Sequence, residues 1–206
     1  MDESALVAAY QERRPLLDAL VATLQQATAA ALEGVAHIDR IAFRAKEQRS
    51  FVVKSANPKY THPLSELEDQ VAGRVITFFR DDIAMVCTAL AEWFGPVERQ
   101  TKEPEEPAEF DYESEHFVLI IPEHYKPAGW TDIDQMPTTF ELQVRTLFMH
   151  AWAEPQHDLG YKGTELDHNT KRELAWVAAS AWGADRTFND IARRLAAGDD
   201  PAAKHA

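Results

Sequence analysis

Both ends of the chain carry helical patterns. Between residues 4 and 33, apolar side chains recur at steps of three and four, and Gly34 follows as a stop signal. Pro15 predicts a kink or a second helix start within this stretch. The same periodicity predicts a long amphipathic helix over 168–196. The row expected to face inward on that helix is Leu174, Val177, Ala178, Ala181, Phe188, Ile191 and Leu195.

The middle of the chain mixes strand and helix patterns. Alternating or β-branched segments predict five strands, over 37–46, 74–79, 97–101, 117–121 and 138–145. Three segments predict further helices, over 47–56, 82–94 and 146–160. Asp81 and Asp82 are expected to cap the second of these helices. The order of elements is therefore a helix, a mixed α and β middle, and closing helices.

Composition narrows the class of protein. The 206 residues include 45% hydrophobic and 27% charged residues, enough apolar content to bury a core. The net charge of −13 argues against a broad nucleic-acid-binding face, although a local basic pocket can still bind a nucleotide. The single cysteine, Cys87, excludes an intramolecular disulfide and a cysteine-rich zinc site. With no secretory signal and no apolar run long enough to span a bilayer, we expect a cytoplasmic protein without a membrane partner.

Basic residues concentrate between positions 40 and 60, where six bases stand against one acid. Arg44 and Lys46 are two apart and share a face of a strand, while Ser50 and Lys54 are four apart and share a face of a helix. This placement would aim cations and a hydroxyl at one spot, as a polyphosphate requires. The alternative is a solvated charged surface.

Two acids are candidates for a metal site. On the strand over 138–145, Glu141, Gln143 and Arg145 point to one face, and burying them is costly unless they serve a site or pair with one another. Asp69 stands just before another strand and could hold Mg²⁺ together with Glu141. The alternatives are a solvent-facing edge strand for the first group and a turn residue for Asp69.

A third polar group has a period of two. Tyr112, Ser114 and His116 would share a face and could stack a base and contact its sugar and phosphates. The alternative is a set of half-exposed strand residues.

These groups occur as five motifs in one order. They are Arg44-x-Lys46-x-x-x-Ser50-x-x-x-Lys54, Asp69…Arg74-Val-Ile, Tyr112-x-Ser114-x-His116, Glu141-x-Gln143-x-Arg145-Thr146 and His150-Ala-Trp152-x-Glu154-x-x-His157-Asp158-x-x-Tyr161-Lys162. Over about residues 38–163 the chain resembles the RelA/SpoT-type alarmone synthetase domain. The resemblance implies an α+β fold, with a mixed five-stranded, nucleotidyltransferase-like sheet flanked by helices. It also implies transfer of a pyrophosphoryl group from ATP to the 3′-hydroxyl of GDP or GTP, which releases AMP and makes (p)ppGpp.

The resemblance assigns roles to particular residues. Those implied for ATP are Arg44 and Arg74, which would flank the adenine, and Lys46, Ser50 and Lys54, which would hold the phosphates. Asp69 and Glu141 would bind Mg²⁺ and act in catalysis. Those implied for the acceptor are Tyr112, which would stack on its base, together with Ser114, His116, Gln143 and Arg145.

One departure from the family pattern leaves the acceptor open. Residues 98–116 hold eight acids and two bases, and Glu113 stands where a base is common, so this segment would repel the acceptor's 5′-phosphates. The alternative acceptors are the 3′ end of tRNA and an adenine nucleotide, both used by toxin-type relatives. A third possibility is a nucleotide-binding module without catalysis, against which the retained pair Asp69 and Glu141 argues.

The expected organisation has three parts. These are an N-terminal helical extension over 1–36, a synthetase domain over 37–163, and a C-terminal helix and tail over 164–206. Such a chain resembles a small stand-alone synthetase. We expect a homo-oligomer, because Trp176 and Trp182 add apolar surface to the last helix beyond one buried face. A toxin would also bring an antitoxin partner.

Overall fold

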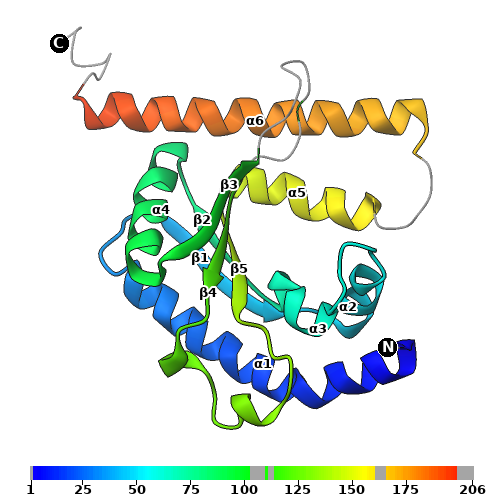
Figure 1. Cartoon of the computed structure of the whole chain (residues 1–206). Helices are drawn as coiled ribbons and strands as arrows, with labels where there is room; N and C mark the ends of the chain where they lie inside the picture. Colours follow the sequence, from blue (N-terminus) through cyan, green and yellow to red (C-terminus); the bar gives the residue numbers. More distant parts are fainter. Residues whose placement is uncertain (1, 103–109, 111–113, 161–165, 199–206) are drawn as a thin grey trace, which may run out of the picture.

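The computed structural model describes residues 2–102, 110, 114–160 and 166–198 (Figure 1). At its centre lie five strands, β1 (Ile38–Ala45), β2 (Val71–Thr77), β3 (Pro96–Lys102), β4 (Ser114–Ile120) and β5 (Thr139–Thr146). They form one sheet in the order β1-β2-β5-β4-β3, in which β2 and β5 are parallel and the other neighbours antiparallel. The α+β fold with a mixed five-stranded sheet is therefore confirmed.

Helices surround the sheet and close both ends of the described chain. The α-helices are α1 (Glu3–Ala31), α2 (Gln48–Ser55), α3 (Pro63–Glu66), α4 (Arg80–Phe94), α5 (Leu147–Gly160) and α6 (His168–Ala196). Three short 3₁₀ helices are η1 (Glu68–Gln70), η2 (Glu123–Tyr125) and η3 (Trp130–Asp132). Among the described helices, none is both long and apolar enough to cross a membrane.

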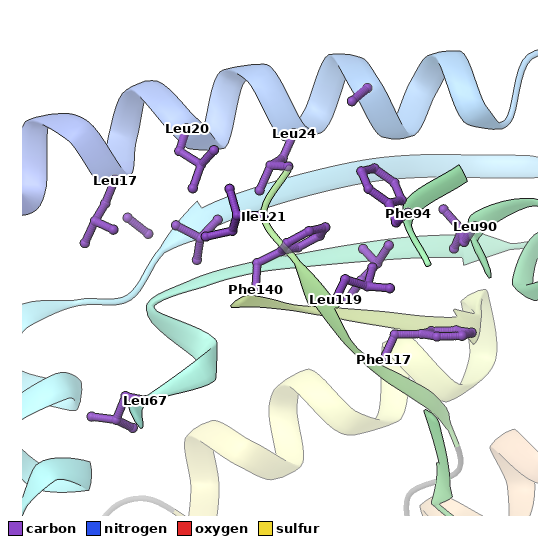
Figure 2. Close-up of a cluster of buried hydrophobic side chains, with 14 of the residues drawn as sticks. Leu17, Leu20, Leu24, Leu67, Leu90, Phe94, Phe117, Leu119, Ile121 and Phe140 are labelled. Atoms are coloured by element: carbon purple, nitrogen blue, oxygen red, sulfur yellow. The ribbon is translucent and has the colours of Figure 1, made fainter. Parts of the chain in front are cut away.

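The main core lies between the sheet and the pair α1 and α4. The Asp2 carboxylate caps α1 by accepting the Ala5 N–H at 2.8 Å. The helix then continues through Pro15, and no second start follows. Leu20 and its neighbours on α1 face the sheet in Figure 2, where Phe140 of β5 lies beneath them. These buried apolar residues leave the opposite sheet face free for polar side chains.

Helix α4 starts earlier than the sequence predicts. Phe79 occupies the cap position, and Asp82 lies in the first turn, where its carboxylate accepts the Phe79 N–H at 3.3 Å. The prediction of a cap at Asp81 or Asp82 was therefore wrong, although the acid still satisfies a backbone donor at the helix start. The helix ends at Gly95, whose φ of 65° is the left-handed conformation that glycine adopts readily.

Helix α6 crosses α5 and the start of α4 (Figure 1). The predicted inward row was wrong for part of its length, because Val177, Phe188 and Leu195 are 45%, 51% and 65% exposed. The prediction holds for Ala178, which is buried, and for Ala181, which packs beside it.

Polar contacts explain how α6 is turned. Buried Asp185 lies 3.2 Å from the guanidinium of Arg80, and the Asn189 side chain accepts the Asp81 N–H at 3.0 Å. These contacts join α6 to the first turn of α4. Because a buried polar group needs its partner, these contacts help to fix the rotation of α6, in which Val177, Phe188 and Leu195 are largely exposed.

Candidate active site

A pocket opens on the sheet face that lies away from α1 and α4. In the sheet register Arg44 pairs with Ala72, and Ala72 with Glu141. Two residues along, Arg74 lies beside Gln143. The pocket encloses about 120 Å³ and is lined by Ala42, Phe43, Arg44, Lys46, Asp69, Ala72, Gly73, Arg74, Glu141 and Gln143. The three predicted segments around residues 44, 69 and 141 thus meet at one place.

Asp69 lies between two lysines at one end of this pocket. Its Oδ2 accepts from Lys46 Nζ at 2.6 Å and from Lys54 Nζ at 2.8 Å. Lys46 follows β1 directly and Lys54 comes from the last turn of α2, so strand and helix both supply a cation, as their spacing predicted. Burial alone would lower the pKa of Lys54, but the hydrogen bond and charge of Asp69 outweigh it and raise that pKa.

Glu141 lies in a second polar cluster on the same face. Its Oε1 is 3.0 Å from His116 Nδ1 and accepts from Gln143 Nε2 at 2.6 Å. Burial alone would raise the pKa of Glu141, but the hydrogen bonds from His116 and Gln143, followed by the charges of His116 and Lys54, lower it from 4.5 to about 2. Glu141 is therefore ionised at neutral pH.

A carboxylate from α5 joins the two arginines predicted for this face. Glu154 Oε1 lies 2.7 Å from Arg74 Nη1 and 3.7 Å from Arg145 Nη1, with His150 Nδ1 at 3.9 Å. Arg145 is itself buried and donates to the Gln143 side chain. The sequence places Glu154 on an amphipathic helix four residues after His150, but this spacing gave no signal that it would reach a strand. The role of Glu154 was therefore missed.

Five of the predicted site residues that the structure describes are not among those lining this pocket: Ser50, Lys54, Ser114, His116 and Arg145. Three of them, Lys54, His116 and Arg145, still contact residues that line it. Ser50 is half-buried on α2 and is not among the lining residues. Ser114 is buried at the start of β4, where it borders a different pocket together with Arg99 and Lys102. Tyr112 lies outside the described residues, as does Glu113.

The two acids, Asp69 and Glu141, suit a divalent cation whose remaining ligands come from a substrate. Asp69 Oδ1 is buried and has no hydrogen-bond partner in the described structure, so one carboxylate oxygen remains available. Glu141 supplies a second ionised carboxylate on the same pocket wall. Within the described residues no group of three or more His, Cys, Asp or Glu side chains could hold a metal. The donor set thus fits Mg²⁺, which proteins usually hold by one or two carboxylates plus substrate phosphates.

A comparison with protein-family models identifies one family for this chain. The model described as "Region found in RelA / SpoT proteins" matches residues 43–166. No curated protein matches the sequence.

Solved structures share the fold at low sequence identity. The small alarmone synthetase 1 from Bacillus subtilis is 20% identical, with 93% of this chain and 96% of that chain covered and a TM-score of 0.69. Structures of that protein bound to its product pppGpp and to AMPCPP also match, both with a TM-score of 0.64 and 20% identity, covering 93% and 94% of this chain and 97% and 98% of those chains. A GTP pyrophosphokinase family protein from Streptococcus pneumoniae is 22% identical, with coverage of 90% and 94% and a TM-score of 0.74.

Proposed function

The chain belongs to the RelA/SpoT family, and from this premise we propose that it is an ATP:GDP/GTP 3′-pyrophosphokinase. It would move a pyrophosphoryl group from ATP to the acceptor's 3′-hydroxyl, releasing AMP and making (p)ppGpp. The observation that carries the proposal is the meeting of Asp69 and Glu141 at one pocket whose walls also include Arg44, Lys46 and Arg74. Phosphoryl transfer depends mainly on alignment and on neutralising phosphate charge, which such a pocket can supply.

The donor side of the pocket is suited to ATP. Lys46 and Lys54 flank Asp69 and would contact the phosphates, where charge-assisted hydrogen bonds are strong. Arg44 and Arg74 come from adjacent antiparallel strands and would flank the adenine, since a planar guanidinium stacks on an aromatic ring.

The acceptor side is the half of the site formed by β4 and β5. His116 and Gln143 pair in the sheet register, and both contact Glu141. Arg145 is tied to this group through Gln143, so the three side chains would support the acceptor while Tyr112 stacks on its base.

Mg²⁺ would be held by Asp69 and Glu141. When bound, it would neutralise charge on the phosphates that the lysines also contact. A carboxylate with a pKa of about 2 is a weak proton acceptor. Glu141 is therefore better suited to bind the metal and orient the attacking 3′-hydroxyl than to accept the proton of that hydroxyl.

A second acceptor class is favoured by the acidic segment before His116. Its eight acids would repel free GDP, which favours an acceptor whose 5′-phosphates lie elsewhere, such as the 3′ end of tRNA. An adenine nucleotide, the other alternative acceptor, carries the same 5′-phosphates as a guanine nucleotide and gains nothing from this repulsion. The net charge of −13 counts against a large tRNA-binding face. We therefore keep GDP or GTP as the first candidate.

The test is a transfer assay with purified protein, Mg²⁺ and ATP labelled at the γ-phosphate. GDP, GTP, GMP, ATP and deacylated tRNA are offered separately. Label on GDP or GTP, with equal release of AMP, is the expected result. Label on tRNA alone, or on a new 3′-pyrophosphorylated adenine nucleotide formed when ATP is the sole nucleotide, would select an alternative acceptor. No transfer to any acceptor would refute both enzymatic proposals.

A further inference from the structure

One turn of α1 contacts the backbone that carries Lys46. The Tyr10 hydroxyl donates to the Lys46 carbonyl at 2.6 Å, and Arg14 Nη1 donates to the same oxygen at 3.1 Å. Both residues precede position 43, where the match to the family begins. The N-terminal helix therefore reaches a site residue from outside the matched region.

Tyr10 is built rigidly into the interior. It is fully buried, and its ring stacks on Phe51 of α2 with centroids 4.1 Å apart and an angle of 17° between the planes. Burial raises the pKa of Tyr10 to about 12, so the hydroxyl keeps its proton and donates at neutral pH. Tyr10 thus connects α1, the end of β1 and the helix that carries Lys54.

Arg13, which precedes Arg14 on α1, supports the segment that carries Asp69. Buried Arg13 donates to the Leu64 carbonyl of α3 at 3.0 Å, and Gln70 Nε2 donates to the same carbonyl at 2.8 Å. The Lys46 N–H in turn donates to the Gln70 carbonyl at 2.8 Å. The backbones at Lys46 and beside Asp69 are therefore tied to each other and to α1.

We propose that Tyr10 and Arg14 are positioning residues of the ATP site. By holding the Lys46 carbonyl, they fix the backbone from which the ammonium reaches Asp69 and the pocket. Neither residue lines the pocket, so both act through Lys46. The inference rests on the proposed function in that it takes ATP as the ligand of this pocket.

The first experiment measures the Kd for ATP with Mg²⁺ by calorimetry, which needs no turnover. Tyr10→Phe keeps the stack on Phe51 and removes only the donor. Losing one hydrogen bond that orients a binding group should weaken ATP binding about threefold to tenfold. Tyr125→Phe is the matched control, because its hydroxyl accepts from Trp93 Nε1 at 3.1 Å and does not line the pocket. The control should bind ATP within about twofold of wild type.

The second experiment asks whether the effect passes through Lys46. In a Lys46→Met background, Tyr10→Phe should cause no further loss of ATP affinity, because coupled residues are not additive. Combining Tyr10→Phe with Arg14→Met removes both side-chain hydrogen bonds to the Lys46 carbonyl. The double variant should therefore lose more ATP affinity than Tyr10→Phe alone.

Several outcomes would overturn the proposal. They are unchanged ATP affinity in Tyr10→Phe, an equal loss in Tyr125→Phe, and an additive loss in the Lys46→Met background. Failure of the proposed function would show separately, as normal ATP binding by the wild type without transfer to any acceptor. Wild type that does not bind ATP would refute both.

Discussion

Replacing Glu141 by glutamine tests the electrostatics of the site in the absence of substrate. A carboxyl pKa that falls from 4.5 to about 2 corresponds to about 3 kcal/mol at neutral pH, at about 1.4 kcal/mol per pH unit. Glutamine keeps the size of the side chain but not its charge. We therefore expect Glu141→Gln to lower the free energy of unfolding at pH 7 by about 2–3 kcal/mol, and the thermal midpoint by about 5–10 °C.

The pH dependence follows from the direction of the pKa change. Because the folded protein lowers the pKa of Glu141, this stabilisation is present above pH 4.5 and is lost as the pH falls through about 2. The difference in stability between wild type and variant should shrink to about 1 kcal/mol at pH 3. Urea unfolding of both proteins at pH 7 and pH 3 measures this difference directly.

A matched variant separates the site from general effects of removing an acid. Glu123 pairs with Lys126, but its side chain is 82% exposed, so Glu123→Gln should change stability by less than about 0.5 kcal/mol at either pH. If Glu141→Gln unfolds like wild type at pH 7, or if the difference grows toward pH 3, the pairing with His116 does not stabilise the fold. Transfer activity should be lost in Glu141→Gln and kept in Glu123→Gln.

Three further predictions concern catalysis, assembly and the acceptor. Asp69→Asn should abolish transfer and lower the thermal midpoint, because two lysines lose their shared anion; normal turnover would remove Asp69 from the mechanism. Sedimentation of the wild type should give a particle mass that is a multiple of 23.2 kDa. The double variant Trp176→Gln, Leu195→Gln should give a smaller particle, since these side chains are 72% and 65% exposed on α6. A wild-type particle of a single chain would contradict this prediction. Tyr112→Ala should raise the KM for the acceptor about tenfold and leave the KM for ATP unchanged, because a stacked base contributes about 1–3 kcal/mol. An equal rise in both KM values would show that Tyr112 does not belong to the acceptor side.

The strands and their polar faces could be predicted because alternation fixes which side chains share a face. Glu141, Gln143 and Arg145 do lie on one face of β5. Lys46 and Lys54 converge on Asp69, whereas Ser50, which was expected to join them, does not line the pocket. That these distant segments would serve one site was implied by the resemblance to the RelA/SpoT-type domain, and the sheet register brings Arg44, Ala72 and Glu141 next to one another.

Contacts between elements could not be read from periodicity. The pairing of Glu154 with Arg74 depends on how α5 packs against the sheet. The hydrogen bond from the Tyr10 hydroxyl to the Lys46 carbonyl depends on how α1 packs against the end of β1. The rotation of α6 was predicted from apolar spacing alone. That spacing was right for Ala178 and Ala181 but not for Phe188 and Leu195, because further along the helix the buried side chains of Asp185 and Asn189 contact the start of α4.

The central place of β5 has a consequence for how the chain folds during synthesis. Until β5 leaves the ribosome, β1 can pair only with β2, and β3 only with β4, and isolated two-stranded pairs are marginal in water. β5 then inserts between β2 and β4, which joins both pairs into one sheet and brings Glu141 opposite Ala72. The last described strand to be made therefore joins the two halves of the sheet, and a nascent chain arrested before it cannot bring Glu141 to the candidate site beside Asp69.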